Sequence, residues 1–422
     1  MANQQAAVPC VLITSTTQWP LPARMAMAFA DIGWRVETIC WYRSPVTVTH
    51  CVSRFHHYAA MRPVDALHKA ILSAAPDLIV PCDDRALAHL QLLYDRLLAS
   101  SNDAVAALIA RSLGDPHGAE AACERASFIN LALQEGVRAP PMVALDSAAD
   151  LPAALEQVGL PAMMKLDNSW GGDGVAKVAT LAEARAVFAT MQRGPGLADR
   201  LRRWVADADV FRALPGPLKA RTRVNVQSFV DGSPANCLVS CWQGELLSII
   251  QVNVLSALHA MGPATIVQLS NDPEIEEAAR RVVRRLGLSG FCGLDFVIAE
   301  DTGEAHLIEM NQRVTPLAHL ALAGGVDPAF ALAARHAAVS KPRAAMTARD
   351  IVAFFPGAWK ADPGNPYLAA AFHDIPVGEP DLVRALMRRS LRRRSAVLRF
   401  LRRFRGSRGT PVDSRAEILP AQ

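Results

Sequence analysis

The chain has 422 residues, of which 51% are hydrophobic and 20% are charged, and its formal net charge is +4. This length predicts two or three domains, and the apolar composition excludes an intrinsically disordered protein. The eight cysteines include no C-x-x-C pair, so we expect free thiols in a reducing compartment and no disulfide or metal framework. The sequence shows neither a membrane-length apolar run nor a signal-peptide pattern at its start, so we expect a cytoplasmic protein.

The first part of the chain alternates strands and helices. Residues 11–16 and 35–42 have the pattern of buried strands, and helices are predicted over 21–31, near 64–74 and over 85–99. This alternation predicts a parallel sheet covered by helices, which is a Rossmann-like layer. The first strand is not followed by a G-x-G-x-x-G turn, so we do not expect a dinucleotide site.

Two carboxylates end the strand predicted within 76–84. Asp83 and Asp84 stand at its carboxyl end, where parallel sheets bind their ligands. Capping of the following helix is the simpler interpretation of this pair. Contact with a substrate is the alternative.

The middle of the chain opens with a helix predicted over 119–135 and then becomes rich in strands. Helices interrupt it near 181–192 and over 273–286. The segment KLDNSWGGDGVAKV, residues 165–178, carries three glycines between two apolar stretches. By itself it fits either an ordinary hairpin turn or a flap that closes over phosphates.

The segment GFCGLDFVIAEDTGEAHLIEMNQRV, residues 290–314, predicts two strands joined by a turn at 301–303. Glu309, Asn311 and Arg313 occupy alternate positions and should share one strand face, with Asp295 opposite the acidic end. Carboxylates in such an apolar setting are costly unless they bind a cation or a partner. Two carboxylates and an amide oxygen are ligands that suit Mg²⁺. A solvated hairpin face is the less favoured alternative.

The chain ends in a basic tail. Eleven arginines and no acidic residue lie between Arg384 and Arg408, and without these eleven the net charge of +4 would become −7. Residues 382–405 place their apolar side chains on one half of a helical wheel, which predicts a basic amphipathic helix. That helix could dock on its own protein or a second subunit, lie on an anionic membrane surface, or bind nucleic acid or another polyanion. Docking is favoured, and nucleic acid is unlikely because only Phe400 and Phe404 interleave the basic residues.

Taken in order, these motifs resemble the ATP-grasp superfamily, which includes biotin carboxylase, carbamoyl-phosphate synthetase and D-alanine–D-alanine ligase. The pattern D-F…E-M-N-Q-R is similar to its metal-binding signature, and AMMK (162–165) to its lysine strand. DNSWGGDGV (167–175) resembles its glycine-rich loop, and VNVQSFVDG (224–232) its hinge. The resemblance spans roughly 75–340.

The resemblance implies ATP and Mg²⁺, or Mn²⁺ in its place, as cofactors. It implies metal ligands at Asp295, Glu309 and Asn311, and catalytic roles for Lys165 and Arg313. The phosphates would contact Arg125, Lys165 and the backbone of Gly171, Gly172 and Gly174, and the adenine would contact Gln227, Ser228 and Val230. Arginine at 125 and glutamine at 227 depart from the lysine and glutamate of many members.

The implied fold is α/β and α+β. It comprises a Rossmann-like pre-ATP-grasp domain (1–115), a two-lobed ATP-grasp domain (116–342) and a small C-terminal region with the Arg-rich helix (343–422). The implied activity is an ADP-forming ligase that joins a small-molecule carboxylate to an amine, with a homodimer as one arrangement. The rivals are a carboxylase-like or thiol-forming ligase, and a non-catalytic nucleotide-binding module that acts through its tail. The expected location of the protein is the cytoplasm, with peripheral attachment to a membrane through the C-terminal helix as the alternative.

Overall fold

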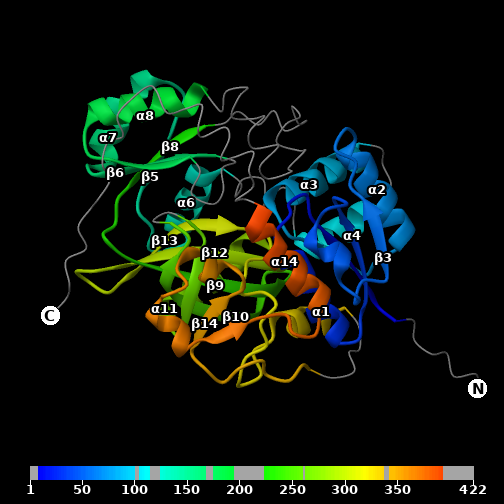
Figure 1. The fold of residues 1–422 in the computed structure, drawn as a ribbon. Helices are drawn as coiled ribbons and strands as arrows, with labels where there is room; N and C mark the ends of the chain where they lie inside the picture. The colour runs from blue at the N-terminus through cyan, green and yellow to red at the C-terminus, as the bar shows by residue number, and fades with distance from the viewer. Residues whose placement is uncertain are drawn as a thin grey trace, which may run out of the picture.

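The protein, analysed as a computed structural model, is described over 8–99, 104–114, 124–167, 174–193, 223–259, 262–336 and 342–392, with side chains as far as 388. Within these ranges it forms a four-stranded parallel sheet, a four-stranded antiparallel sheet and a seven-stranded sheet that is mainly antiparallel. Figure 1 shows the parallel sheet on the right (blue), a small lobe at the upper left and the largest sheet between them. The fold is therefore a Rossmann-like α/β layer followed by a two-lobed α+β domain.

The first sheet has the order β3-β2-β1-β4 and is parallel throughout. Its elements, in chain order, are β1 (Cys10–Thr14), α1 (Leu21–Asp31), β2 (Arg35–Cys40), η1 (Pro45–Val48), β3 (Arg54–His57), α2 (Pro63–Ala74), β4 (Leu78–Pro81), α3 (Asp84–Leu98) and α4 (Ala104–Leu113). The predicted helix 21–31 is confirmed to the residue. The second predicted strand is shorter than expected, because it ends at Cys40.

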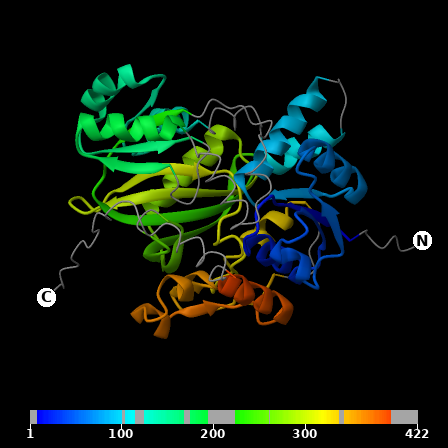
Figure 2. The same ribbon diagram turned by 45° about the horizontal axis from the view of Figure 1, so that its top comes forward.

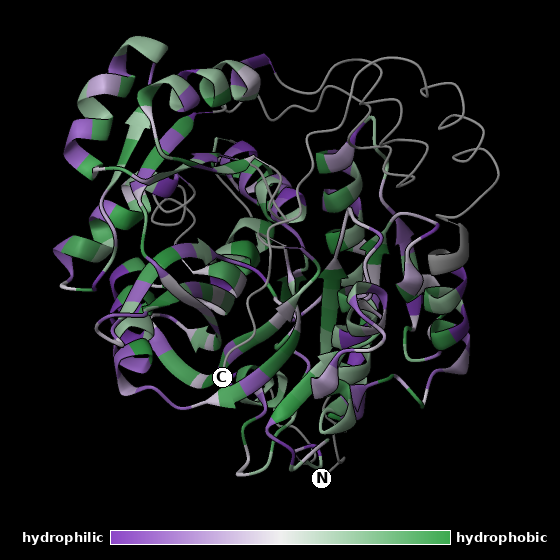
Figure 3. Cartoon of the chain, turned by 60° about the vertical axis from the view of Figure 1, so that its left-hand side comes forward, coloured by the Kyte–Doolittle hydropathy of each residue, from purple (hydrophilic) through white to green (hydrophobic). Residues whose placement is uncertain are grey.

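Helices cover both faces of this sheet, which is why the central strand β1 is buried at every position. Successive side chains of β1 point to opposite faces. Val11 and Ile13 pack in one hydrophobic cluster with α1, and Leu12 packs in another with α2, α3 and α4. Figure 3 shows the strands of the molecule as largely hydrophobic, with hydrophilic residues concentrated on the outer helices.

The small lobe is an antiparallel sheet with the order β5-β8-β6-β7. Its strands are β5 (Met142–Leu145), β6 (Ala162–Leu166), β7 (Val175–Val178) and β8 (Val224–Ser228), and its helices are α7 (Leu151–Val158) and α8 (Leu181–Arg193). The helix α6 (Arg125–Gln134) lies between this lobe and the large sheet and contacts β5 and β13. The predicted helix 119–135 is thus observed from Arg125 onward, and 115–123 lie outside the described residues.

The large sheet has seven strands in the order β13-β12-β9-β10-β11-β14-β15. They are β9 (Gly232–Trp242), β10 (Glu245–Ala257), β11 (Ala264–Ser270), β12 (Gly290–Ala299), β13 (Ala305–Asn311), β14 (Ile351–Phe354) and β15 (Phe372–Asp374). The predicted helix 273–286 is confirmed as α11 (Pro273–Leu286), since Asp272 caps its first turn and Gly287 ends it at a φ of +59°. A short helix, α12 (Pro328–Ala333), follows the last strand of the acidic hairpin.

The C-terminal region contributes β14 and β15 to the large sheet, together with α13 (Gly357–Ala361) and α14 (Pro380–Arg392). Figure 2 shows this region (orange) along one side of the molecule, beneath both the large sheet and the first domain. Leu382 and Leu386 of α14 are buried in the same cluster as α1. The first turns of the predicted tail helix therefore dock on their own protein. None of the described helices is both long and apolar enough to cross a membrane.

A close junction fixes the first domain against the large sheet. At the end of α4, Gly114 bridges to Leu288, and a Cβ at Gly114 would lie 2.4 Å from the Gly287 carbonyl oxygen. The φ of +91° at Gly114 also favours glycine. Beside it, Gln312 donates from Nε2 to the Leu113 carbonyl at 3.0 Å. Gln312, which lies between Asn311 and Arg313, is thus anchored to the first domain.

Candidate functional site

The acidic hairpin is formed by β12 and β13, which pair antiparallel with Asp295 directly opposite Glu309. The predicted opposition of these two carboxylates is confirmed. Asn311 donates from Nδ2 to Asp295 Oδ2 at 3.1 Å, and Asn236 of the neighbouring strand β9 donates to the other oxygen of Asp295. Asn236 was not singled out from the sequence. A lone amide among the apolar residues of β9 was the available signal.

The pKa values of the two carboxylates are shifted in opposite directions. Burial and the negative charge of Glu309 raise the pKa of Asp295 to about 6. Burial also acts to raise the pKa of Glu309, but Arg125 and Lys165 outweigh it and hold that pKa below its usual value. One carboxylate is therefore satisfied by basic side chains, while the other is held beside it at an electrostatic cost.

Two basic residues approach Glu309 from elements far away in the sequence. Arg125, at the start of α6, contacts Glu309 Oε1 through Nη2 at 2.8 Å and also donates to the Leu166 carbonyl. Lys165 on β6 is buried and donates from Nζ to the Ile308 carbonyl at 3.3 Å. Burial lowers the pKa of Lys165 to about 8, although Glu309 acts in the other direction.

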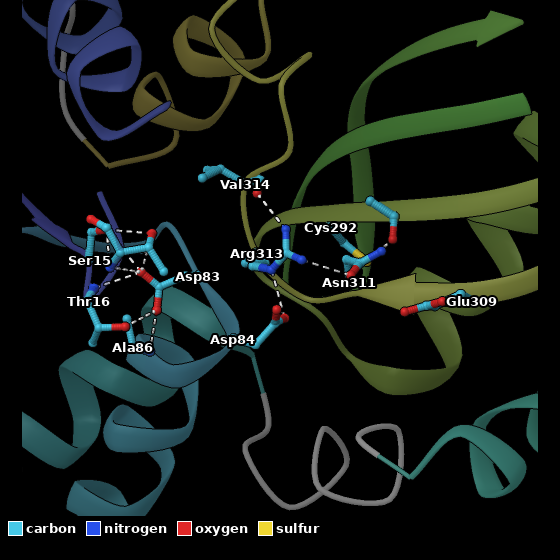
Figure 4. Close-up of polar contacts among 12 residues, drawn as sticks. Ser15, Thr16, Asp83, Asp84, Ala86, Cys292, Glu309, Asn311, Arg313 and Val314 are labelled. Atoms are coloured by element: carbon cyan, nitrogen blue, oxygen red, sulfur yellow. Dashed lines mark hydrogen bonds and ion pairs between the residues drawn. The ribbon is translucent and has the colours of Figure 1, made fainter. Parts of the chain in front are cut away.

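Arg313 lies beyond the end of strand β13, so a shared strand face describes only Glu309 and Asn311. Strand β13 ends at Asn311, and the Arg313 N–H donates to the Asn311 carbonyl at 2.8 Å, so the backbone turns there. The guanidinium is directed to the first domain, where Nε contacts Asp84 Oδ1 at 2.7 Å (Figure 4). Its Nη2 donates to Asn311 Oδ1 at 3.1 Å and its Nη1 to the Val314 carbonyl at 3.2 Å.

Asp83 and Asp84 have different partners. Asp83 caps α3 by accepting from the Ala86 N–H at 2.9 Å, as the simpler interpretation predicted. It also accepts from Ser15 Oγ at 2.9 Å and from the N–H and hydroxyl of Thr16 at 2.7 and 2.8 Å. Figure 4 shows this cluster beside the Asp84–Arg313 contact. The carboxyl edge of the first sheet therefore lies next to the acidic hairpin.

The hinge residues lie at the end of β8. Gln227 is buried and donates from Nε2 to the Pro140 carbonyl at 3.3 Å. The N–H of Ser228 donates to the Pro141 carbonyl at 3.0 Å. Val230 follows two residues beyond the strand and is half-buried.

The glycine segment is a hairpin at its base. Strands β6 and β7 pair antiparallel, and the Gly174 carbonyl accepts from the Leu166 N–H at 2.8 Å. Gly174 has a φ of +80°, which explains the glycine there. Gly171 and Gly172 lie outside the described residues.

The donor set suits a hard divalent cation. In the part of the chain that the structure describes, no group of three or more His, Cys, Asp or Glu side chains gathers as a metal site. Asp295 and Glu309 instead form a pair with the Asn311 amide beside it. Mg²⁺ commonly takes only one or two protein carboxylates and completes its shell with water and phosphate oxygens. A cation between these carboxylates would also relieve the repulsion that raises the pKa of Asp295.

Comparisons with known proteins identify a domain similar to part of this chain. Residues 215–316 match a family model described as the ATP-grasp domain. Acetyl-CoA carboxylase 2 of Oryza sativa subsp. japonica is 29% identical over 163 residues, which are 38% of this chain and 6% of the relative. The chain thus spans only a small part of the curated relatives it matches.

Solved structures share the fold at low identity. Biotin carboxylase of Campylobacter jejuni, solved with βγ-ATP, superposes with a TM-score of 0.53 at 13% identity, covering 73% of this chain and 66% of its own. N5-carboxyaminoimidazole synthetase of Staphylococcus aureus, complexed with ADP, gives 0.53 at 12%, covering 74% and 72%. The biotin carboxylase domain of 2-oxoglutarate carboxylase from Hydrogenobacter thermophilus gives 0.55 at 12%, covering 79% and 71%. Residues 215–316 therefore match an ATP-grasp domain, and the chain shares its fold with these solved structures.

Proposed function

We propose that the protein is an ADP-forming ligase that activates a small-molecule carboxylate as an acyl phosphate and transfers the acyl group to an amine. In the first step a carboxylate oxygen attacks the γ-phosphorus of ATP, and the bond to the bridging oxygen breaks to release ADP. In the second step the amine nitrogen attacks the acyl carbon, inorganic phosphate leaves, and the nitrogen loses a proton. Both steps depend on positioning and charge neutralisation.

One observation carries the proposal, namely the pair of opposed carboxylates with basic groups beside one of them. Asp295 faces Glu309, and Arg125 contacts Glu309 at 2.8 Å. Lys165 is buried and adds a positive charge close to the same carboxylate. A purely structural core would not hold four ionisable groups together at such a desolvation cost. Magnesium would pair with the two carboxylates, and the triphosphate would pair with Lys165 and Arg125.

The chain's own residues have distinct parts in this proposal. Asp295 and Glu309, with Asn311, would hold Mg²⁺, which would neutralise charge on the phosphate oxygens. Lys165 and Arg125 would offset the remaining negative charge of the triphosphate. Arg313 would orient the carboxylate through paired N–H groups. Gln227, Ser228 and Val230 would border the adenine, and the N–H groups of Gly171, Gly172 and Gly174 would contact the phosphates.

A carboxylase-like ligase that activates bicarbonate is the second candidate, and the relatives favour it. The curated matches are acetyl-CoA carboxylases, and one structural neighbour was solved with MgADP and bicarbonate. Bicarbonate would enter the same first step as any other carboxylate. The two candidates therefore differ in substrate and share the nucleotide site.

ADP release from the purified chain tests the proposal. The assay would combine Mg-ATP with panels of amino acids, other small carboxylic acids and bicarbonate, with and without amines. We expect magnesium-dependent ADP release that Glu309→Gln lowers by at least about a hundredfold. Glu304→Gln is the matched control, because Glu304 lies on the same hairpin but pairs with Arg138 on the exposed side, at 2.9 Å. Undiminished turnover in Glu309→Gln would contradict the proposal.

A further inference from the structure

Arg313 lies among carboxylates from two parts of the chain. Asp84 contacts its Nε at 2.7 Å. Asp83 precedes Asp84 in the chain, and Asp295 accepts a hydrogen bond from Asn311 Nδ2 while Asn311 Oδ1 accepts one from Arg313 Nη2. Carboxylates of the first domain and of the acidic hairpin therefore lie near one guanidinium, and Asp84 is the one in direct contact with it.

The three carboxylates differ in how they are satisfied. Asp83 accepts hydrogen bonds from Ser15, Thr16 and Ala86, which stabilise its charged form. Asp295 belongs to the proposed metal pair. Asp84 is the accessible one, with its side chain 42% exposed, and within the described ranges the contact to Arg313 is its one side-chain partner. Asp84 is thus the carboxylate that a ligand can reach.

Arg313 keeps donors for a ligand. A guanidinium has five N–H groups. Nε uses one for Asp84, Nη1 one for Val314 and Nη2 one for Asn311, so each terminal nitrogen retains one among the described contacts. A carboxylate bound by those two N–H groups would stand within about 6 Å of the Asp84 carboxylate, where like charges repel. A positive group next to the bound carboxylate would change this repulsion into an attraction.

We propose that the carboxylate substrate is an amino-acid-type zwitterion, whose carboxylate binds Arg313 and whose ammonium pairs with Asp84. This inference rests on the proposed ligase function and narrows its substrate class. Binding leaves the net charge unchanged, because the zwitterion is neutral and adds one carboxylate beside Arg313 and one ammonium beside Asp84. Asp84 is then a residue that determines specificity from the first domain, while the phosphates are held by the two lobes of the grasp.

The experiment measures ADP release by the full chain with Mg-ATP and hydroxylamine, a small amine that converts any acyl phosphate to a hydroxamate. The carboxylates are the twenty standard amino acids, their N-acetyl and deaminated counterparts, and bicarbonate. We expect at least one free amino acid to support ADP and hydroxamate formation at least about tenfold faster than its N-acetyl and deaminated forms. Because hydroxylamine is constant, the comparison isolates the carboxylate side of the reaction.

Two variants assign the effect to Asp84. Asp84→Asn should raise KM for the free amino acid by roughly tenfold or more and remove its preference over the deaminated acid. Asp65→Asn is the control, because Asp65 is also a first-turn aspartate of the first domain, paired with Arg96 at 2.6 Å and 48% exposed. Asp65→Asn should leave KM for the free amino acid and the preference over the deaminated acid unchanged.

The outcomes separate this inference from the ligase function. Equal or faster turnover with the deaminated acids or with bicarbonate would overturn the zwitterion inference and leave the ligase standing. Unaltered discrimination in Asp84→Asn would overturn the role of Asp84. Absence of ADP release with every carboxylate would overturn both. The comparison within the wild type decides the substrate class even where a variant fails to fold.

Discussion

Arg125, the first residue of α6, donates to Glu309 of β13 at 2.8 Å although 184 positions separate them in the sequence. The same arginine donates to the Leu166 carbonyl of the small lobe. It therefore ties the lysine strand of one lobe to the acidic hairpin of the other. The contact joins the two lobes beside the side chains that we propose to hold a nucleotide.

Replacing Arg125 should weaken both the fold and the site. In Arg125→Met, Glu309 would lose its nearest cation in a setting where its side chain is only 26% exposed. We expect a loss of about 2 kcal/mol in the free energy of unfolding, measured by urea denaturation, and roughly tenfold weaker Mg-ADP binding by calorimetry. Arg138→Met is the control, since its pair with Glu304 is more exposed, and it should cost less than about 1 kcal/mol. Equal losses in the two variants would contradict this account.

Burial of Lys165 should lower the free energy of unfolding at neutral pH. Its folded-state pKa of about 8 lies below the ordinary value of 10.5, so between these pH values the unfolded chain binds the proton and the folded chain does not. The free energy of unfolding should therefore rise with pH across this window, and the penalty should be fully present below it. Lys165→Met should be more stable at pH 7 by roughly 1–3 kcal/mol and should flatten the rise, while nucleotide binding is lost. Lys177→Met, at an exposed position of β7, should do neither. A lower free energy of unfolding for Lys165→Met than for the wild type at pH 7 would show that burial of Lys165 does not destabilise the fold.

Asp374 should stabilise the junction between the C-terminal region and the first domain. It is buried, pairs with Arg24 of α1 and accepts from His319 Nε2 at 3.0 Å. Burial acts to raise its pKa, but His319 and Arg24 lower it overall, so its contribution is present above the unfolded-state pKa and is lost as the pH falls through the lower folded value. We expect Asp374→Asn to lose about 3 kcal/mol at pH 7, with a smaller difference from the wild type in acid. Asp350→Asn, at an exposed position, should change little. A constant difference at all pH values would contradict an ionic contribution.

Docking of the tail helix can be tested by truncation. Leu382 and Leu386 are 0% and 3% exposed in the core that includes α1. A chain that ends after Gly378 should lose about 4 kcal/mol of stability, because it leaves the apolar surface under both leucines uncovered. A chain that ends after Arg388 keeps both and should unfold at nearly the same urea concentration as the full chain. Similar stability of the two truncated chains would refute the docking.

Much of the site could be predicted because its determinants are local. The opposition of Asp295 and Glu309 follows from a hairpin whose turn and alternation set the register. Asp83 caps α3 because it directly precedes that helix. The helix α11 matches its prediction because Asp272 and Gly287 mark both of its ends. The surroundings of Arg313 could not be predicted, because a strand pattern does not show that β13 stops at Asn311 and turns.

What the sequence by itself determined is therefore the order of the motifs, the acidic hairpin and the lysine strand, each fixed by neighbours a few residues away. Only the tertiary structure decided that Arg125 meets Glu309, that Asn236 meets Asp295, and that Arg313 reaches Asp84 across 229 positions. These contacts depend on how three sheets pack together, and no pattern within a segment encodes that packing. The physical reason is that a charged group needs a partner once it is buried, because an unpaired buried charge is costly. Burial arises only when separate layers of the fold pack over one another.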